Sequence, residues 1–434
     1  MEDSEVKVVE SSLVAPSEPT PRKGLWLSHL DLLMAYKGHT PTIYLFHSNV
    51  GATSDFFDVA RLKEAMAKAL VAFYPLAGRL GVDSSGRTEI DCNGEGALFV
   101  VARSDVTIDE IKDVKPSPVL RRELVPRVEP SSVVMAVQVT FFRCGGVALG
   151  TALHHASVDA VSAFHFLQTW SAFSRDGDRA AVELPCHDRT LLRARSPPAI
   201  HPDALSMFHA KLPLSDPSGP ITTRVFPISK EQVASLKRLC GGGASTFCAL
   251  SALVWRCACA ARRLPPDAEA RLTFSANIRR RVTPPLPERY FGNALVRAGV
   301  SAAVRDIVAA SASEALASVA GRIGATVHRM QDVMVRSAID YYETAEVGGR
   351  SPAKGTLPET DLQVTSWLGM PAYDADFGWG KPRVMSRAES NRGGVVHLMS
   401  DGPAGGVRVL MCMEAANVKE LERLLYQALD RYAC

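Results

Sequence analysis

Hydrophobic residues in the first half of the chain alternate between the spacing of helices and that of strands. A spacing of three and four residues runs through two segments, with apolar positions at Val59, Leu62, Met66 and Leu70 and at Val161, Phe164, Leu167 and Trp170. Between them, "RTEIDCNGEGALFVVA" is typical of a hairpin, and "VVMAVQVTFFRCGGVALGTAL" predicts two strands joined at residues 144–146. We therefore expect His155 where a buried strand ends and a helix begins.

The second half mixes the same two patterns. "TRVFPI" predicts a strand, and Ser229 with Gln232 has the spacing of a capping box at the start of the next helix. "STFCALSALVWRCACAARR" predicts an apolar helix, "EARLTFSANIRRR" a strand, and 304–342 further helix. Residues 184–220 are rich in proline, as linkers are. At about 100 to 200 residues per domain, we expect an α/β protein with domains at 1–183 and 221–434, joined by a crossover at 184–220.

Composition excludes several classes of protein. Hydrophobic residues make up 47% and charged ones 22%, which is typical of globular proteins. A net charge of +3 is too small to indicate a nucleic-acid partner. No secretory leader and no apolar run long enough for a membrane helix appears. The nine cysteines form no CxxC pair, so we expect neither a metal site nor a disulfide framework. The simplest expectation is a cytoplasmic monomer.

The stretch "HHASVD" carries the candidate chemistry. His155 and Asp159 lie four residues apart, and an imidazole at a strand exit can accept a proton from an attacking hydroxyl or amine, a contribution of about 10² to 10⁴ in rate. The alternative is a core histidine that is hydrogen-bonded to Asp159. His328 and Asp332 have the same spacing, and we expect them to be a surface pair on one helix. "DFG" at 376–378 lacks the other kinase motifs, and there is no GxSxG elbow or P-loop.

Several motifs occur together in a fixed order along the chain. "HHASVD" is followed about 220 residues later by "DFGWG" at 376–380. The others are "HTPTIYLF" at 39–46, "FYPLAGRL" at 73–80, "IDCNGEGALFV" at 90–100, "QVTFFRCGG" at 138–146, "DRTLLRARSPP" at 188–198, "PPLPERYFGN" at 284–293 and "YDADFGWGKP" at 373–382. The ordered set resembles the plant BAHD acyltransferases, and more closely their hydroxycinnamoyl transferase branch.

This resemblance implies two similar mixed-sheet domains of the chloramphenicol acetyltransferase type, with the active site in a channel at their interface. His155 would be the general base, and Asp159 would turn away to pair with Arg279. The aspartate that the family usually has at the position of Asn277 is absent here.

The resemblance implies roles for further residues. Asp376 is named beside the histidine as a motif residue but is expected to hold a loop, and Trp379 is a candidate donor to the oxyanion. Thr40 and Tyr44 would line the acceptor pocket. Acyl-CoA would be a co-substrate, with no permanent cofactor and no metal. Its phosphates have four candidate partners: Arg256, Arg280, Arg281 and Lys381.

The acceptor is expected to lack a carboxylate. Relatives that acylate shikimate or quinate usually carry an arginine in an "SW-x-R-x-P" stretch, but "SWLGMP" has Gly369 at that place. With Leu368 and Met370 beside it, the pocket would suit an aromatic amine such as tryptamine, tyramine or serotonin, acylated with a hydroxycinnamoyl or benzoyl group. An O-acyltransferase using shikimate, quinate, glycerol or another alcohol, and an inactive acyl-CoA-binding protein, are the alternatives.

Overall fold

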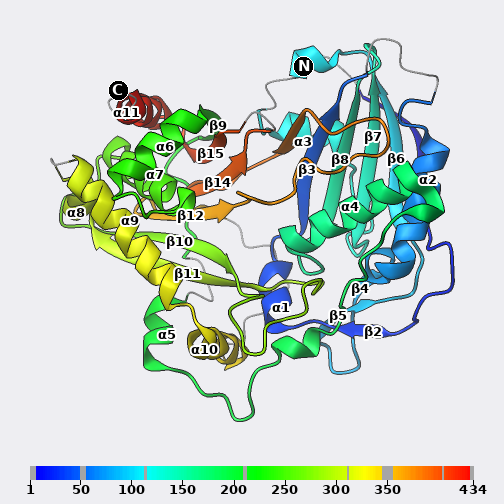
Figure 1. Ribbon diagram of the computed structural model, residues 1–434, viewed down its shortest axis with the longest axis horizontal. Coiled ribbons are helices and arrows are strands. Elements are labelled where there is room, and N and C mark those ends of the chain that lie inside the picture. Colours follow the sequence, from blue (N-terminus) through cyan, green and yellow to red (C-terminus); the bar gives the residue numbers. More distant parts are fainter. Residues whose placement is uncertain are drawn as a thin grey trace.

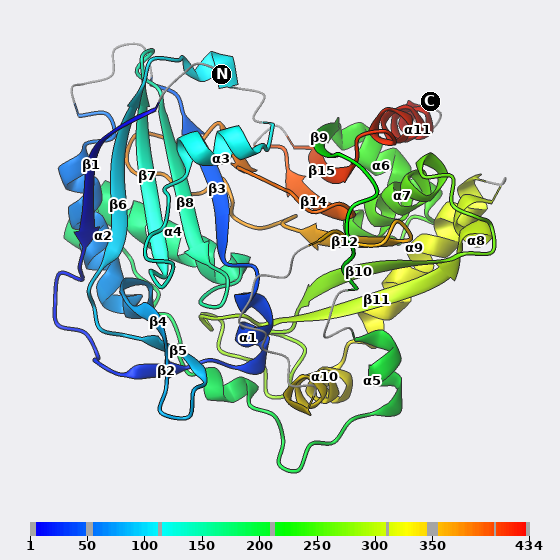
Figure 2. The same ribbon diagram turned by 180° about the vertical axis from the view of Figure 1, so that it is seen from behind.

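Two six-stranded mixed sheets stand side by side, each covered by helices (Figures 1 and 2). The computed structural model describes residues 6–48, 55–111, 115–208, 213–309, 312–344, 355–402 and 405–430. The expected α/β fold with two mixed sheets is confirmed. No helix in these ranges is both long and apolar enough to cross a membrane.

The first sheet has the order β1-β6-β7-β8-β3-β13 and is antiparallel except between β6 and β7. Its strands are β1 (Lys7–Val14), β3 (His39–Phe46), β6 (Ala97–Ser104), β7 (Met135–Phe142), β8 (Val147–His154) and β13 (Val384–Arg387). Helices α2 (Val59–Ala72) and α4 (Ala160–Asp176) cover one face, and α3 (Pro118–Leu124) packs on the other. Strand β8 is buried along its whole length because both faces are covered.

The second sheet has the order β11-β10-β12-β14-β15-β9, with β10, β12 and β14 parallel. Its strands are β9 (Ile221–Ile228), β10 (Glu269–Asn277), β11 (Leu295–Ala303), β12 (Asp361–Ser366), β14 (Val395–Ser400) and β15 (Val407–Glu414). The apolar helix α7 (Thr246–Ala261) contacts this sheet and is surrounded by α6 (Lys230–Leu239), α8 (Val304–Val308), α9 (Ala312–Arg329) and α11 (Val418–Asp430). This position explains why α7 is apolar on nearly every face.

Smaller elements complete the fold. They are α1 (His29–Ala35), α5 (Pro202–Met207), α10 (Asp332–Thr344), the short sheet of β2 (Gly24–Trp26), β5 (Thr88–Asp91) and β4 (Arg79–Val82), and the 3₁₀ turns η1 (Tyr74–Ala77), η2 (Ile108–Ile111), η3 (Gly177–Arg179) and η4 (Arg189–Leu192). Helix α10 packs against both α1 and α5, so it joins the two halves at one end of the molecule.

The second half of the chain contributes one strand to the first sheet. Residues 184–220 separate the strands of the two sheets except for β13, which pairs antiparallel with β3 from Val384 opposite Leu45 to Arg387 opposite Thr42. The preceding "DFGWG" segment packs on the same domain, with the Phe377 ring 4.8 Å from that of Trp170 in α4. The second half of the chain is therefore part of the first sheet, and residues of both halves line a cavity between the two sheets.

A buried acid connects three distant segments. Asp31 closes a capping box with Ser28 at the start of α1. Its Oδ1 lies 3.1 Å from Nη1 of Arg189 in the crossover, and it accepts hydrogen bonds from the backbone N–H (2.8 Å) and side-chain amide (2.9 Å) of Asn293. Asp31 and Arg189 are both almost wholly buried, so neither charge has water to replace its partner.

Replacing Asp31 with alanine should therefore lower the free energy of unfolding by about 3 to 5 kcal/mol, because Arg189 is left charged and buried. Urea denaturation at pH 7.5 measures this. Asp178→Ala is the control, because Asp178 pairs with Lys68 at the surface and its loss should cost about 0 to 1 kcal/mol. Equal, small effects of the two substitutions would show that the buried pair does not carry the stability assigned to it.

Candidate active site

His155 occupies the turn between β8 and α4, where two hydrogen bonds hold its main chain. Its N–H donates to the carbonyl of Gly38 (2.8 Å), and its own carbonyl accepts from the side-chain amide of Asn293 (2.8 Å). The same amide donates to Asp31. The histidine backbone is thus tied to the segment before β3 and to the buried acid that links the two halves.

Asp159 faces away from the histidine and forms an ion pair with Arg279. The contacts are bidentate, at 2.8 and 3.0 Å, and the carboxylate also accepts from the backbone N–H groups of Ser162 (3.0 Å) and Ala294 (3.1 Å). Burial by itself would raise the pKa of Asp159, but Arg279 outweighs burial and holds that pKa below its ordinary value. Asp159 is the N-cap of α4, so this pair fixes where the helix begins.

Asn277 supports the same arginine. Its side-chain oxygen accepts from the backbone N–H of Arg279 at 3.1 Å and from the guanidinium at 3.4 Å. The amide oxygen therefore provides an acceptor without a negative charge at the place where the family resemblance leads one to expect an aspartate.

A cavity of about 580 Å³ opens beside His155, between the two sheets. Its apolar wall comes mainly from α4 and from the segment after β12: Val158, Val161, Phe164, Leu167, Trp367 and Met370. Its polar lining includes Thr40, Tyr44, Gln363, Thr365 and Ser366. Of the expected acceptor residues, Thr40, Tyr44 and Met370 are in this wall.

Leu368 and Gly369 are not among the described residues that line the cavity, contrary to the sequence-based expectation. Leu368 packs against the core of the second sheet, because the chain turns after Trp367. Gly369 has φ of +71°, a conformation that is strained for residues with a side chain. An arginine at this position would keep the same backbone only with strain, although nothing lies within 4 Å of a Cβ atom placed there.

The imidazole of His155 is neutral at physiological pH. Burial is the main cause and lowers its pKa to about 3, and the positive charges of Lys37 and Arg387 act in the same direction. Its own carbonyl oxygen and Asp159 oppose the shift. Its Nδ1 is buried without a hydrogen-bond partner on another described residue. A neutral imidazole with one buried nitrogen can take up a proton at the other, as a general base must.

Asp376 and Trp379 both lie outside the cavity wall. Oδ1 of Asp376 accepts from the backbone N–H groups of Gly378 (2.9 Å) and Gly380 (3.0 Å), so the carboxylate closes its own loop. The ring of Trp379 stacks on Phe57 at 5.2 Å, with the guanidinium of Arg61 4.5 Å from its centre. The expected oxyanion role of Trp379 thus has no geometric support, and the tryptophan in the cavity wall is Trp367.

The four cations considered for the CoA phosphates are dispersed, and none is among the described residues that line the His155 cavity. Arg256 donates to the carbonyl of Ala309 (3.4 Å), Arg280 is exposed near Glu288, and Lys381 pairs with Asp374 (2.8 Å).

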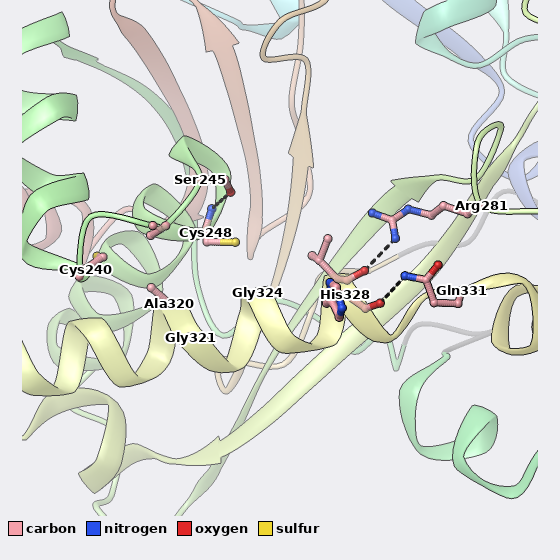
Figure 3. A pocket seen from close by; sticks show the side chains of 13 residues that line it. Cys240, Ser245, Cys248, Arg281, Ala320, Gly321, Gly324, His328 and Gln331 are labelled. Atoms are coloured by element: carbon pink, nitrogen blue, oxygen red, sulfur yellow. Dashed lines mark hydrogen bonds between the residues drawn. The ribbon is translucent and has the colours of Figure 1, made fainter.

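Arg281 lines a second, more open cavity of about 610 Å³ between the start of α7 and the end of α9 (Figure 3). There it donates to the carbonyls of Val327 and Met330, both at 2.9 Å.

The second HxxxD pair does not lie on one helix, contrary to expectation. His328 is in the last turn of α9, whereas Asp332 begins α10. Asp332 accepts from the backbone N–H of Thr283 (2.7 Å) and pairs with Arg336 one turn further along α10 (3.4 Å). His328 lines the second cavity, where its carbonyl accepts from Gln331 (Figure 3).

Sequence reasoning missed the charged part of the cavity wall, which consists of Lys37, Arg387, Arg392 and the buried His397. Lys37 comes two residues before the "HTPTIYLF" motif, which was a usable signal. The other three come from β13, the segment after it and β14. Nothing in their local sequence indicates that those elements meet beside His155.

Comparison with known proteins agrees with this arrangement. Residues 4–427 match the model of the Transferase family. The chain belongs to this family, the BAHD acyltransferases. It is 45% identical to putrescine hydroxycinnamoyltransferase 1 from Oryza sativa subsp. japonica, over 98% of this chain and 99% of that protein, and 35% identical to shikimate O-hydroxycinnamoyltransferase from Nicotiana tabacum, over 97% and 99%.

Among solved structures, the fold is similar to that of F. graminearum TRI101 complexed with ethyl coenzyme A. The TM-score is 0.76 at 17% identity, and 94% of this chain and 98% of that chain are covered. The family assignment from the ordered motifs is thus confirmed, and the protein is an acyltransferase.

Trp379→Phe should leave kcat within a few-fold of wild type, because the indole packs on Phe57 and Arg61 outside the cavity. Initial rates of CoA release with saturating acyl-CoA and acceptor measure this. Loss of an oxyanion donor typically costs 10² to 10³ in kcat, so a loss of that size with unchanged thermal stability would restore the oxyanion role.

Proposed function

We propose that this protein transfers a hydroxycinnamoyl or benzoyl group from CoA to the nitrogen of an aromatic amine without a carboxylate. The observation that carries the proposal is the neutral, half-buried His155 at a cavity formed by both halves of the chain. Names of relatives support the reaction class, since one is a putrescine and another a shikimate hydroxycinnamoyltransferase.

The cavity provides the parts of a direct transfer. The amine attacks the thioester carbonyl while His155 removes its proton, and because Nδ1 is buried, Nε2 accepts it. The tetrahedral intermediate then collapses, the C–S bond breaks, and the CoA thiolate takes the proton from the imidazolium. Both substrates react in one cavity, so the mechanism requires no covalent acyl-enzyme.

Arg281 is the best placed of the four candidates for the CoA phosphates. Of the two cavities described here within residues 6–430, one has Arg281 in its lining, together with Ser245, the N-cap of the sixteen-residue helix α7. Positive charge and a helix N-terminus both favour phosphate. A monomeric state and a cytoplasmic location remain predictions.

The acceptor follows from the apolar wall and the turn at Gly369. Phe164, Trp367 and Met370 offer a surface for an aromatic ring. Because residue 369 is glycine, this chain lacks the arginine that the family resemblance leads one to expect as a carboxylate clamp in shikimate-using relatives. An alcohol acceptor such as shikimate, acting through the same His155, is the second candidate, since the tobacco relative is named for it.

His155→Ala should lower kcat by about 10² to 10⁴, the usual contribution of a general base, with acyl-CoA binding near wild type. Release of free CoA, followed with a thiol reagent, measures turnover, and calorimetric titration with acyl-CoA measures binding. His201→Ala, at an exposed histidine that caps α5, is the matched control. Full activity of His155→Ala would rule out the base assignment, and a wild type that binds acyl-CoA without turnover would favour the inactive alternative.

With coumaroyl-CoA, kcat/KM for tryptamine should exceed that for shikimate at least about tenfold, because Phe164, Trp367 and Met370 offer contacts to the tryptamine ring and position 369 has no arginine to bind the shikimate carboxylate. Product analysis by mass spectrometry distinguishes the amide from the ester.

With tryptamine, kcat/KM should also rise from pH 7 to 9, because only the unprotonated amine attacks and His155 is already neutral over this range. Faster turnover of shikimate would contradict the proposed acceptor.

A further inference from the structure

Two polar side chains of the second sheet face the His155 cavity without hydrogen-bond partners. Gln363 of β12 and His397 of β14 both line the cavity, and the two residues are only 4% and 7% exposed. Neither Nε2 of Gln363 nor Nδ1 of His397 has a hydrogen-bond partner on another described residue. Buried polar atoms are nearly always paired in folded proteins, so two exceptions at one cavity indicate a place for a polar group of a ligand.

The two side chains are close neighbours on one face of the sheet. Strands β12 and β14 run parallel, with Gln363 opposite Val395 and Thr365 opposite His397. All four residues line the cavity, as the alternation of side chains along a strand requires. Adjacent strands lie about 4.8 Å apart, and Gln363 and His397 are offset by one such pair, so both side chains can contact one small group between them.

An aromatic surface lies beside this pair. The ring of Trp367, which also lines the cavity, has its centre 6.3 Å from that of His397 and 5.9 Å from that of Phe164 in α4. Aromatic rings pack well against such a wall. A substrate ring that packs on Trp367 and Phe164 can therefore present a polar substituent on its edge to His397 and Gln363.

A hydroxyl group matches the two unpartnered atoms. Burial, with the nearby Arg387 and Lys37, lowers the pKa of His397 well below its ordinary value, so at neutral pH its ring has one N–H and one acceptor nitrogen. A hydroxyl both donates and accepts, and it can therefore pair with the amide N–H of Gln363 and with Nδ1 of His397 in either tautomer. A carboxylate only accepts and would need the proton at Nδ1, and an ammonium cannot accept from Gln363.

We propose that Gln363 and His397 form a subsite that binds the hydroxyl of a phenol. The inference rests on the proposed function and deepens it, because the phenol belongs to one of the two substrates that meet at His155. Two sources supply the same group: the ring of a hydroxylated amine such as tyramine, and the ring of a 4-hydroxycinnamoyl group such as coumaroyl. The analogue without the hydroxyl is disfavoured because it leaves the buried polar atoms of the subsite unpaired.

The test measures kcat/KM at pH 7.5 for the four combinations of cinnamoyl-CoA or coumaroyl-CoA with phenethylamine or tyramine. At this pH a phenol keeps its proton, because its pKa is about 10. In wild type, the hydroxyl of one substrate should raise kcat/KM at least about tenfold, and the substrate whose hydroxyl has this effect is the one that occupies the subsite. Gln363→Met and His397→Phe, which remove the hydrogen-bonding atoms and keep a side chain of similar shape, should each reduce this ratio to at most about threefold.

Gln427→Met, the same substitution at an exposed position on α11, is the matched control and should keep the wild-type ratio. Comparing the variants with wild type separates the subsite from any intrinsic effect of the hydroxyl on reactivity, which the substitutions would leave unchanged.

Three results would overturn the subsite: no effect of either hydroxyl in wild type, a ratio that neither substitution changes, or an equal loss with all four substrate pairs, which would assign the two residues a structural role. A higher KM for shikimate in both variants, without an effect of either hydroxyl, would assign the pair to a carboxylate and also overturns it.

If one variant does not fold, the other decides, and the milder Gln363→Asn decides if neither folds. Acylation of shikimate but of neither amine would refute the proposed function itself. The comparison of cinnamoyl-CoA with coumaroyl-CoA then uses shikimate as the acceptor, so the two failures are distinguishable.

Discussion

The buried ion pair between Asp159 and Arg279 is the interaction on which the site depends. Asp159 caps α4 directly after the turn that carries His155, and Arg279 follows β10 in the other half of the chain. Two buried charges are stable only with each other and with further hydrogen bonds, which Ser162, Ala294 and Asn277 supply. The pair therefore fixes the start of α4 against the second sheet, and with it the position of the histidine.

A second polar network reaches the same turn through the neighbouring residue Asn293. Asn293 donates to the carbonyl of His155 and to Asp31, and Asp31 pairs with Arg189 of the crossover. The turn that carries His155 is thus held by two buried networks, each of which bridges the halves of the chain. Such a turn has little freedom to move, as the general-base role that we propose for His155 requires.

Burial and positive charge both act on the imidazole of His155. Burial lowers its pKa and so keeps it unprotonated at neutral pH, and Lys37 and Arg387, which act in the same direction, also line the cavity. In contrast, the "DFGWG" segment does not contribute Asp376 or Phe377 to the described cavity lining. Asp376 accepts hydrogen bonds within its own loop, and Phe377 packs on Trp170.

The amino-acid sequence by itself determined the alternation of helices and strands, the strand exit at His155 and the family. The elements depend on local periodicity and the family on the order of motifs, and both can be read along the chain without knowledge of its fold. Only the tertiary structure decided that β13 joins the first sheet, that Leu368 and Gly369 turn out of the cavity wall, and that Trp367 rather than Trp379 lines it. It alone also placed Lys37 beside Arg387 and Arg392, because Lys37 is 350 residues before Arg387 in the sequence and the segments meet only in the folded protein. Long-range packing determines which charged residues line the same cavity, and the local sequence around each residue does not predict this.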